Sequence, residues 1–322
     1  MDELLVTRLG SIGGLEFRRD ARLSEYTRFG IGGAADLLVD AHTNASMIAA
    51  LDAIRGSGVA FEVIGDGTNL IVSDAGFRGI ILRYRGSAIR VDGVTVEVEA
   101  GAVLQMLVDE TIANGLAGVH TMTGIPGSVG AAVYGNAGAY GRSISQSVRS
   151  VSYYDGSSVG ELSNAQCEFQ YRESIFKKNK SWIILSTELL LEAGDATELR
   201  ANAERIRKIR DEKYPPTMRC AGSIFKNLVL GELEGGVQSR VPANVVREGK
   251  VPAAWFLDEA GVKGMRIGGI HVADYHANLI YNSGGGTAAE LCEVIRNCKR
   301  GVEDRFGLVL EEEVQYIGEG LV

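Results

Sequence analysis

The sequence predicts an α+β protein with more than one domain. Its 322 residues are enough for two or three domains, each with its own hydrophobic core. Segments with helical spacing of apolar residues alternate with short apolar runs typical of strands, and glycine turns separate them. Hydrophobic residues make up 45% of the chain and charged residues 23%, as in an ordinary globular protein.

The first third of the chain predicts a small α/β unit. Thr43 or Asn44 can cap a helix that carries apolar residues at helical spacing through Ile54, and Gly56 ends it. Strands are expected over 61–64, 70–72 and 79–84. By contrast, the first two dozen residues are only weakly patterned.

The rest of the chain continues the same alternation. A half-buried strand is expected over 94–99, because apolar and charged side chains alternate there. Helices are expected over 103–112, 197–213, 253–259 and 287–306, and further strands over 148–154, 181–191, 266–270, 277–281 and 308–317. Pro215 and Pro216 indicate a domain boundary, and the polar stretch 228–250 is longer than a simple connection requires.

Charge and cysteine usage exclude several classes of function. A formal net charge of -8 argues against nucleic acid or an anionic membrane as a partner, so local donors must hold any phosphate. Cys167, Cys220, Cys292 and Cys298 show no paired spacing, and no leader or membrane-length apolar run is present. We therefore expect a cytoplasmic protein. The four histidines are too scattered to predict a metal site.

Two glycine-rich segments are the most unusual feature of the sequence. The segment 123–141, TGIPGSVGAAVYGNAGAYG, holds six glycines and four alanines but no charged residue, and the shorter segment 65–69 reads GDGTN. Glycine costs backbone entropy on ordering, so something must lie close to this backbone. The composition supports two explanations equally: a bound ligand, or close packing of one backbone on another. The second segment, placed directly after an apolar run, favours the ligand.

Neither segment matches the usual dinucleotide or triphosphate motif. Successive N–H groups of a glycine turn can nevertheless bind an anion without a lysine. Gly65, Gly67 and Asn69 could form one such cradle and the segment 124–130 another, while Asn136 could offer an amide to a ring edge. Two cradles predict a ligand that contains a diphosphate and a flat heterocycle.

Three polar residues outside these segments are candidates for chemistry. Arg172, Ser223 and Glu313 stand in the segments YRESIF, CAGSIFKN and LEEEV. Taken singly, such an arginine is more often a surface ion pair, the serine part of a turn, and the glutamate solvated.

The order of the segments resembles a known family. The matching segments are YTRFGIGG, GDGTNLIVSD, GIPGSVGAAVYGNAGAYG, YRESIF, CAGSIFKN, VPAAWFLDEAGVKG, RIGG, HANLIYN and EEEVQYIG. They resemble the flavin-dependent UDP-N-acetylenolpyruvoylglucosamine reductases, known as MurB, and the YRES form is similar to their type II branch. Proline commonly stands in this family where the chain has Glu312, which we expect to face solvent because neighbours on a strand point to opposite faces.

The resemblance implies a fold and a function. An FAD-binding half of the vanillyl-alcohol-oxidase (PCMH) type would comprise two subdomains, 1–91 and 92–213, and a C-terminal α+β substrate domain would comprise 214–322. The implied reaction converts UDP-N-acetylenolpyruvoylglucosamine to UDP-N-acetylmuramate with NADPH and FAD, in the peptidoglycan synthesis that supports cell wall biogenesis, cell shape and cell division. The partners expected are the UDP-sugar and NADPH alone, with the protein a monomer.

The resemblance also implies residue roles. Arg172 and Glu313 would stabilise the enol intermediate, and Ser223 would deliver the proton. Lys213, Asn227 and Lys263 would contact the substrate. The residues expected to bind FAD are Gly65, Gly67, Thr68, Asn69, Gly124, Ile125, Pro126, Gly127, Ser128, Gly130, Asn136, Ala137 and Gly138.

Two other functions stay open at this point. The first is a flavin oxidase of the same fold that acts on another small alcohol or sugar. The second is a catalytically silent protein that only binds a nucleotide sugar. Rapid reaction of the reduced flavin with oxygen would favour the first, and ligand binding without NADPH consumption would favour the second.

Overall fold

The structure, a computed structural model, describes residues 3–321 and divides the chain into two compact units. The first unit takes the chain up to Ala21, Ala35–Asp66 and Arg78–Pro215, and the second takes Arg22–Ala34, Gly67–Phe77 and the chain from Pro216 onward. The chain thus passes from the first unit to the second inside the Pro215-Pro216 pair. The predicted division into three sequential ranges stays a prediction.

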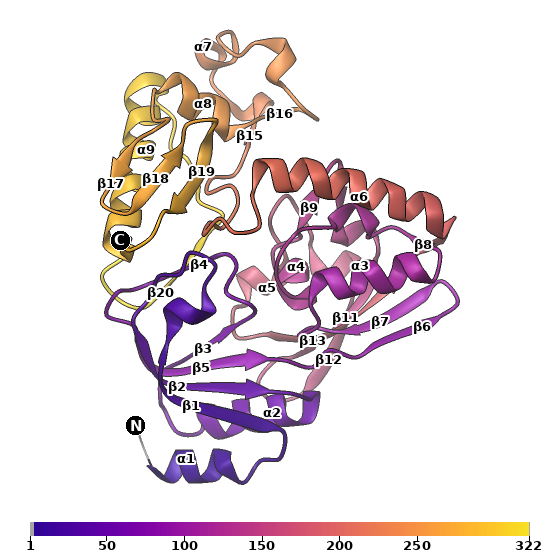
Figure 1. The fold of residues 1–322 in the computed structure, drawn as a ribbon. Coiled ribbons are helices and arrows are strands. Elements are labelled where there is room, and N and C mark those ends of the chain that lie inside the picture. The colour runs from indigo at the N-terminus through magenta and orange to yellow at the C-terminus, as the bar shows by residue number, and fades with distance from the viewer. Residues whose placement is uncertain (1–2, 322) are drawn as a thin grey trace. The chain divides into compact units, whose positions relative to one another are not determined.

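A four-stranded sheet with the order β1-β2-β5-β3 belongs to the first unit (Figure 1). Its strands are β1 (Leu15–Arg22), β2 (Ala34–Ala41), β3 (Phe61–Ile64) and β5 (Phe77–Tyr84). Strands β3 and β5 are parallel, with Phe61 opposite Ile80. The helices α1 (Glu3–Gly10) and α2 (Asn44–Arg55) pack against each other in this part of the unit.

Helix α2 begins where the sequence predicts, because Thr43 and Ser46 form a capping box. Thr43 Oγ1 accepts a hydrogen bond from the N–H of Ser46, and Ser46 Oγ accepts one from the N–H of Thr43, both at 3.0 Å. Such reciprocal caps satisfy N–H groups that the first helical turn leaves unpaired. Met47, Leu51 and Ile54 are buried in the core of the unit, so the predicted helix is confirmed.

A five-stranded antiparallel sheet with the order β12-β11-β13-β7-β6 completes the framework of the first unit. Its strands are β6 (Ile89–Asp92), β7 (Thr95–Glu99), β11 (Val148–Tyr154), β12 (Val159–Ser163) and β13 (Ile183–Leu190). Val96 and Val98 of β7 are buried and Glu97 is exposed, which is the predicted alternation.

Helices cover this sheet. Helix α4 (Val129–Tyr134) packs on β7 and β13, and α3 (Leu104–Ala113) packs on α4 and on α6 (Ala196–Lys213), as Figure 1 shows. The remaining elements of the unit are α5 (Ile175–Lys178), β8 (Leu116–Ala117) paired with β14 (Glu192–Ala193), and β9 (Gly138–Ala139) paired with β10 (Arg142–Ser143).

The second unit is built on the sheet β17-β18-β19. Its strands are β17 (Arg266–Ile267), β18 (Ile270–Ala273) and β19 (His276–Asn282), and α8 (Ala253–Glu259) and α9 (Ala288–Phe306) pack against them. Thr287 caps α9 in a second capping box, with Glu290. A parallel pair joins β4 (Leu70–Val72) to β20 (Gln315–Ile317), so the second glycine turn leads into this unit.

Several sequence expectations need correction. The final strand is only β20, because residues 311–313 pair by isolated bridges and single hydrogen bonds. The weakly patterned N-terminal region forms α1 and β1, and the glycine segment contains α4. The long polar stretch holds β15 (Leu228–Val229), α7 (Gly235–Gln238) and β16 (Lys250–Val251), with β15 and β16 paired.

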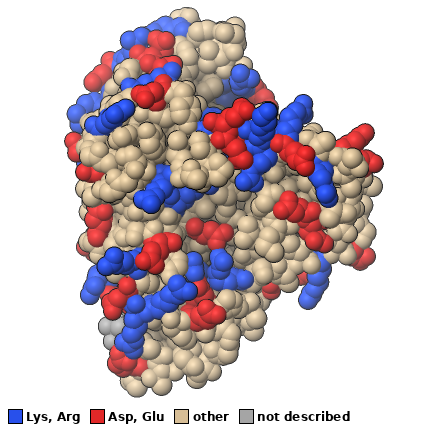
Figure 2. All heavy atoms as spheres, in the orientation of Figure 1, with Lys and Arg blue, Asp and Glu red and all other residues tan. Residues whose placement is uncertain are grey.

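The charge on the surface and the polarity of the helices are those expected from the amino-acid composition. On the face drawn in Figure 2, acidic and basic side chains are interspersed. Among residues 3–321, no helix is both long enough and apolar enough to cross a membrane.

Candidate active site

The two glycine segments meet in the first unit. A Cβ built on Gly65 would lie 2.8 Å from Ser128 Oγ and 3.5 Å from Ala131 Cβ. Ser128 is the N-cap of α4, where its Oγ accepts a hydrogen bond from the N–H of Ala131 at 3.3 Å. The turn after β3 and the start of α4 are therefore neighbours, although more than sixty positions separate them in the sequence.

The main-chain donors at this junction fit a diphosphate. Within residues 3–321, the N–H groups of Gly65, Gly127 and Ser128 donate to no oxygen of the chain. Gly127 is fixed in place because its carbonyl accepts from the N–H of Leu104 at 2.9 Å, and its φ of 116° is one that glycine adopts without strain. N–H groups held in this way can bind phosphate oxygens without a lysine. The residues present thus fit the FAD that the resemblance implies.

Other glycines in these segments serve packing of the chain on itself. A Cβ at Gly67 would overlap the carbonyl oxygen of Tyr26, in the second unit. In the first unit, a Cβ at Gly130 would lie 2.8 Å from Ala100 Cβ, and one at Gly138 would lie 2.5 Å from the carbonyl oxygen of Arg142. Packing therefore explains these three glycines, while ligand binding by Gly65 and Gly127 stays a prediction.

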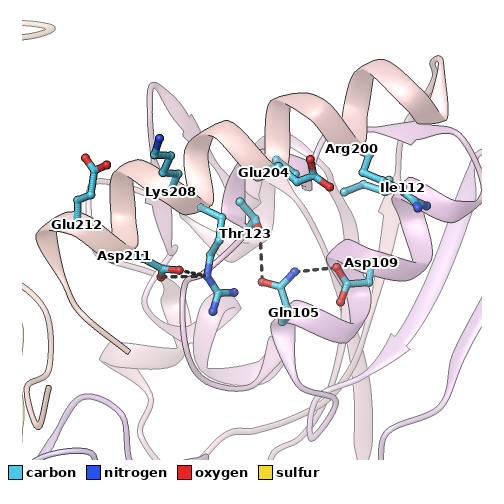
Figure 3. Close-up of a pocket in the computed structure, with 11 residues that line it drawn as sticks. Gln105, Asp109, Ile112, Thr123, Arg200, Glu204, Lys208, Asp211 and Glu212 are labelled. Carbon is cyan, nitrogen blue, oxygen red and sulfur yellow. Dashed lines mark hydrogen bonds and ion pairs between the residues drawn. The ribbon is translucent and has the colours of Figure 1, made fainter. Parts of the chain in front are cut away.

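Gln105 of α3 holds the start of the longer glycine segment. Its Oε1 accepts from the N–H of Gly124 at 2.8 Å and from Thr123 Oγ1 at 3.3 Å, while its Nε2 donates to Asp109 Oδ1 at 2.8 Å. Figure 3 shows Gln105 at the base of a cavity of about 1000 Å³ between α3 and α6. Within the described chain, the residues that line this cavity include none of the predicted site residues.

Arg172 is anchored to the glycine segment within the first unit. Its Nη2 donates to the carbonyl of Gly138 at 3.1 Å, and Asn136 Nδ2 donates to the carbonyl of Gln170 at 2.8 Å. The fully buried Ser174 donates from Oγ to the carbonyl of Tyr134 at 2.7 Å. The loop that carries Arg172 is thus tied at three points to residues 134–138.

Arg172 also has an unusual backbone conformation. Its φ of 61° lies in the left-handed region, which costs a non-glycine residue free energy. Lys177 Nζ donates to the carbonyl of Arg172 at 2.7 Å, and the guanidinium carbon lies 5.1 Å from the centre of the Tyr171 ring. Strained residues concentrate at functional sites because the surrounding contacts have to hold them.

The other predicted residues of the first unit have simpler settings. Ile125 and Ala137 pack against the core of the unit, and Pro126 lies between Gly124 and Gly127. Lys213 ends α6, with its Nζ 5.0 Å from the centre of the Tyr214 ring.

Ser223 and Glu313 come together in the second unit. Ser223 forms a bridge with Leu279 of β19, and its neighbour Ile224 accepts a hydrogen bond at its carbonyl from the N–H of Glu313 at 2.7 Å. Gly222, with φ of 81°, has no atom of the described chain within 4 Å of a built Cβ.

The glycine turn contributes to this second cluster as well. Thr68 and Asn69 close the turn before β4, and Asn69 Nδ2 donates to the carbonyl of Glu313 at 2.8 Å. Asn227 Oδ1 accepts from the N–H of Ala253, the first residue of α8, at 3.3 Å. Lys263 Nζ donates to Asp258 Oδ2 at 2.7 Å, a partner that the sequence did not indicate.

Glu312 does not face open solvent, which corrects the expectation. Its side chain is 22% exposed, and its Oε1 accepts from Lys299 Nζ of α9 at 2.9 Å. The Glu312 side chain points toward α9 instead. The carboxylate that replaces the family's proline is therefore matched by a cation on the adjacent helix.

Sequence reasoning missed three residues that position the site. Gln105, Ser174 and Asn278 each use a side chain to hold the main chain of a predicted segment. Ser174 lies inside the quoted YRESIF segment and could have been singled out. Gln105 and Asn278 carry no local signal, because their partners lie 19 and 53 positions away.

Comparison with known proteins identifies the family. A family model described as an FAD binding domain matches residues 35–160, and one described as the C-terminal domain of UDP-N-acetylenolpyruvoylglucosamine reductase matches residues 214–317. The UDP-N-acetylenolpyruvoylglucosamine reductase of Solibacter usitatus is 58% identical over 311 residues, which cover 97% of this chain and 100% of the relative. The chain belongs to this reductase family.

Further relatives of the reductase agree. The UDP-N-acetylenolpyruvoylglucosamine reductase of Rubrobacter xylanophilus is 34% identical over 302 residues, or 93% of this chain and 95% of the relative. The crystal structure of MurB from Thermus caldophilus matches with a TM-score of 0.73 at 26% identity, over 94% of this chain and 99% of that chain. The predicted fold class, the flavin cofactor and the class of enzyme are therefore confirmed.

Proposed function

We propose that Arg172, Ser223 and Glu313 carry the reduction of UDP-N-acetylenolpyruvoylglucosamine to UDP-N-acetylmuramate in this reductase. When bound, FAD would supply the hydride that reduces the enolpyruvyl double bond, with NADPH as the source of that hydride. The chain's own residues then have two tasks. They stabilise the negative charge that spreads over the adjacent carbon and the carboxylate, and they provide a proton to that carbon.

Arg172 and Glu313 perform the first task, Arg172 through its positive charge and Glu313 as a carboxylic acid that donates a hydrogen bond, because an ionised carboxylate would repel the developing charge. A guanidinium offers fixed, permanently charged donors to a carboxylate. The three anchors of the Arg172 loop support this role, because a preorganised cation avoids reorganisation as charge develops. Glu313 is held at both main-chain groups, by Ile224 and by Asn69, which fixes its place beside the segment of Ser223.

Ser223 performs the second task. Its hydroxyl donates the proton to the carbon next to the carboxylate, and the product is the saturated ether. A serine hydroxyl is a weak acid, so this step requires a strongly basic carbon and a pocket with little water. The observation that carries the proposal is the hydrogen bond between Glu313 and Ile224, which sets two residues of complementary function on adjacent segments of one unit.

Cofactor and substrate contacts complete the proposal. The N–H groups of Gly65, Gly127 and Ser128 would hold the diphosphate of FAD. The other residues expected to bind FAD belong to the same two glycine segments. Lys213, Asn227 and Lys263 contact the UDP-sugar. The working form is a monomer in the cytoplasm. The four cysteines without disulfide bonds support this reducing compartment.

The test is turnover with each substrate. Purified protein with bound FAD should consume more than one equivalent of NADPH per flavin only when UDP-N-acetylenolpyruvoylglucosamine is present, and mass spectrometry should detect UDP-N-acetylmuramate in an amount equal to the sugar consumed. Rapid oxidation of the reduced flavin by oxygen, without turnover of the enolpyruvyl sugar, would instead support the oxidase. The molar mass of the holoenzyme in analytical ultracentrifugation tests whether the protein is a monomer.

A further inference from the structure

Asn278 of β19 directs its side chain at the segment that carries Ser223. The residue is 2% exposed. Its Oδ1 accepts from the N–H groups of Ile224 at 3.1 Å and Phe225 at 2.9 Å, and its Nδ2 donates to the carbonyl of Phe225 at 2.9 Å. The two residues that follow Ser223 are therefore held by one buried amide, in addition to the bridge between Ser223 and Leu279.

The same short segment is held from its other side by the residues around Glu313. Glu313 donates its N–H to the carbonyl of Ile224 at 2.7 Å, and Lys226 donates its N–H to the carbonyl of Glu311 at 2.9 Å. The segment 223–226 thus lies between β19 and the segment 311–313. A shift of its backbone would move Ser223 relative to Glu313.

We propose that Asn278 is a positioning residue that fixes Ser223 for proton delivery, an inference that rests on the role of Ser223 proposed above. An amide fits this arrangement, because its oxygen accepts from two N–H groups and its nitrogen donates to the carbonyl of Phe225. The N–H of Ile224 also donates to the main-chain carbonyl of Asn278 at 3.2 Å, so the N–H and carbonyl of Phe225 depend most on the side chain. A carboxylate would oppose the Phe225 carbonyl, and an apolar side chain would remove the partner of both the N–H and the carbonyl of Phe225. Asn278 itself needs no contact with the substrate.

Asn282 provides a matched control. It lies four positions along the same strand and is 4% exposed. Its amide also makes three hydrogen bonds to main-chain groups, donating to the carbonyl of Phe29 at 2.9 Å and accepting from Gly284 at 2.9 Å and Gly286 at 3.0 Å. These partners lie outside the Ser223 segment, so loss of this amide costs stability without the same effect on Ser223.

The experiment separates the two half-reactions of the holoenzyme by stopped flow. In Asn278→Asp, flavin reduction by NADPH should stay within about twofold of wild type, while reoxidation by UDP-N-acetylenolpyruvoylglucosamine should slow about 10²-fold, the usual effect of a misplacement near 1 Å. The solvent isotope effect on reoxidation should rise. Asn282→Asp should lower the melting temperature similarly and leave reoxidation within a few fold of wild type. Equal slowing of reoxidation in both variants would overturn the proposal.

A double variant tests whether Asn278 acts through Ser223. In the Ser223→Ala background, Asn278→Asp should slow reoxidation no further, whereas additive losses would contradict the coupling. Normal reoxidation in Ser223→Ala alone would refute the proton-donor role itself, independently of Asn278.

If Asn278→Asp fails to fold, Asn278→Ser replaces it. Faster hydrogen exchange of the Phe225 amide is the readout that does not depend on activity, and unchanged exchange of that amide would also overturn the proposal.

Discussion

Asn69 donates a hydrogen bond from its side-chain Nδ2 to the main-chain carbonyl of Glu313 at 2.8 Å. The main-chain carbonyl of Asn69 in turn accepts from the N–H of Gln315 at 3.0 Å. The last residue of the predicted flavin turn and the predicted catalytic glutamate therefore belong to one hydrogen-bonded segment. A change in the turn is expected to reach the chemistry through this link.

Asn69→Ala should weaken both folding and catalysis. It leaves the partly buried carbonyl of Glu313 without this donor, which costs about 1–3 kcal/mol in the free energy of unfolding. Flavin reoxidation by the substrate should slow, and urea titration and stopped flow measure the two effects. Asn114→Ala is the control, because its amide makes a similar 2.8 Å bond to the carbonyl of Glu110 at an exposed helix end. Equal, small losses in both variants would contradict the prediction.

Gly67→Ala should be far more damaging than an equivalent change at an open turn. A Cβ at Gly67 would overlap the carbonyl oxygen of Tyr26, and its φ is 64°. Gly93 has a similar φ of 57°, but no described atom lies within 4 Å of a built Cβ, so Gly93→Ala should cost only about 1–2 kcal/mol. Denaturant unfolding and the ratio of FAD to protein check both variants. Similar losses would mean that conformation alone, and not packing, requires glycine at position 67.

Much of the framework follows from local sequence signals. The helices that begin at Asn44 and Ala288 were predicted from apolar periodicity, with Thr43 or Asn44 as the expected cap of the first. The structure shows capping boxes at Thr43 and Thr287. Helix α4 was missed, because its run of small residues has little amphipathic pattern and its N-cap Ser128 lies among glycines. Glu311 to Glu313 were predicted as strand, yet they pair only through scattered bonds that depend on the remote segment 224–226.

The candidate site likewise has residues that the sequence predicts and residues that it does not. Arg172, Ser223 and Glu313 were predicted from motif resemblance, and their roles stay predictions until they are measured. Residues that support them through distant main-chain groups could not be found, because nothing near Asn278 in the sequence indicates that Phe225 is its partner. Side chains that hydrogen-bond to distant main-chain groups can be recognised only when the structure shows which segments are neighbours.

Glu312→Pro should be tolerated. Within the described chain, the N–H of Glu312 donates to no acceptor, so proline removes no main-chain hydrogen bond there. The variant loses the ion pair with Lys299, worth up to about 1 kcal/mol, and proline restores about 0.4–1 kcal/mol by restricting the unfolded chain. The free energy of unfolding should therefore change by less than about 1 kcal/mol.

Glu313→Pro is the stability control for that variant. It removes the N–H that donates to the carbonyl of Ile224 and should destabilise the protein distinctly more. Urea titration of both variants decides the matter. A large loss for Glu312→Pro would mean that the pair with Lys299 holds the segment in place.

His120 should make the stability depend on pH in mildly acid solution. Burial, with a smaller effect from the positive charge of Arg142, lowers the pKa of His120. The unfolded chain, in which histidine titrates near pH 6.5, therefore binds the proton first as the pH falls. Stability is full above about pH 6.5 and declines as the pH falls through the lower folded pKa.

His120→Asn should reduce that decline, and urea titrations between pH 5 and pH 7.5 measure the slope. In the folded protein, Nδ1 of His120 accepts from the N–H of Gly118 at 3.3 Å, which requires this nitrogen to be unprotonated. Parallel curves for the variant and the wild type would show that His120 makes no contribution to the slope.

The most direct test of the central claim is single-turnover kinetics of Ser223→Ala with bound FAD. NADPH should reduce the flavin at a rate within about twofold of wild type. Reoxidation by UDP-N-acetylenolpyruvoylglucosamine should slow by about 10²–10⁴-fold, the usual contribution of a positioned proton donor. Reoxidation at the wild-type rate, or equal slowing of both half-reactions, would contradict the assignment of Ser223 as the proton donor.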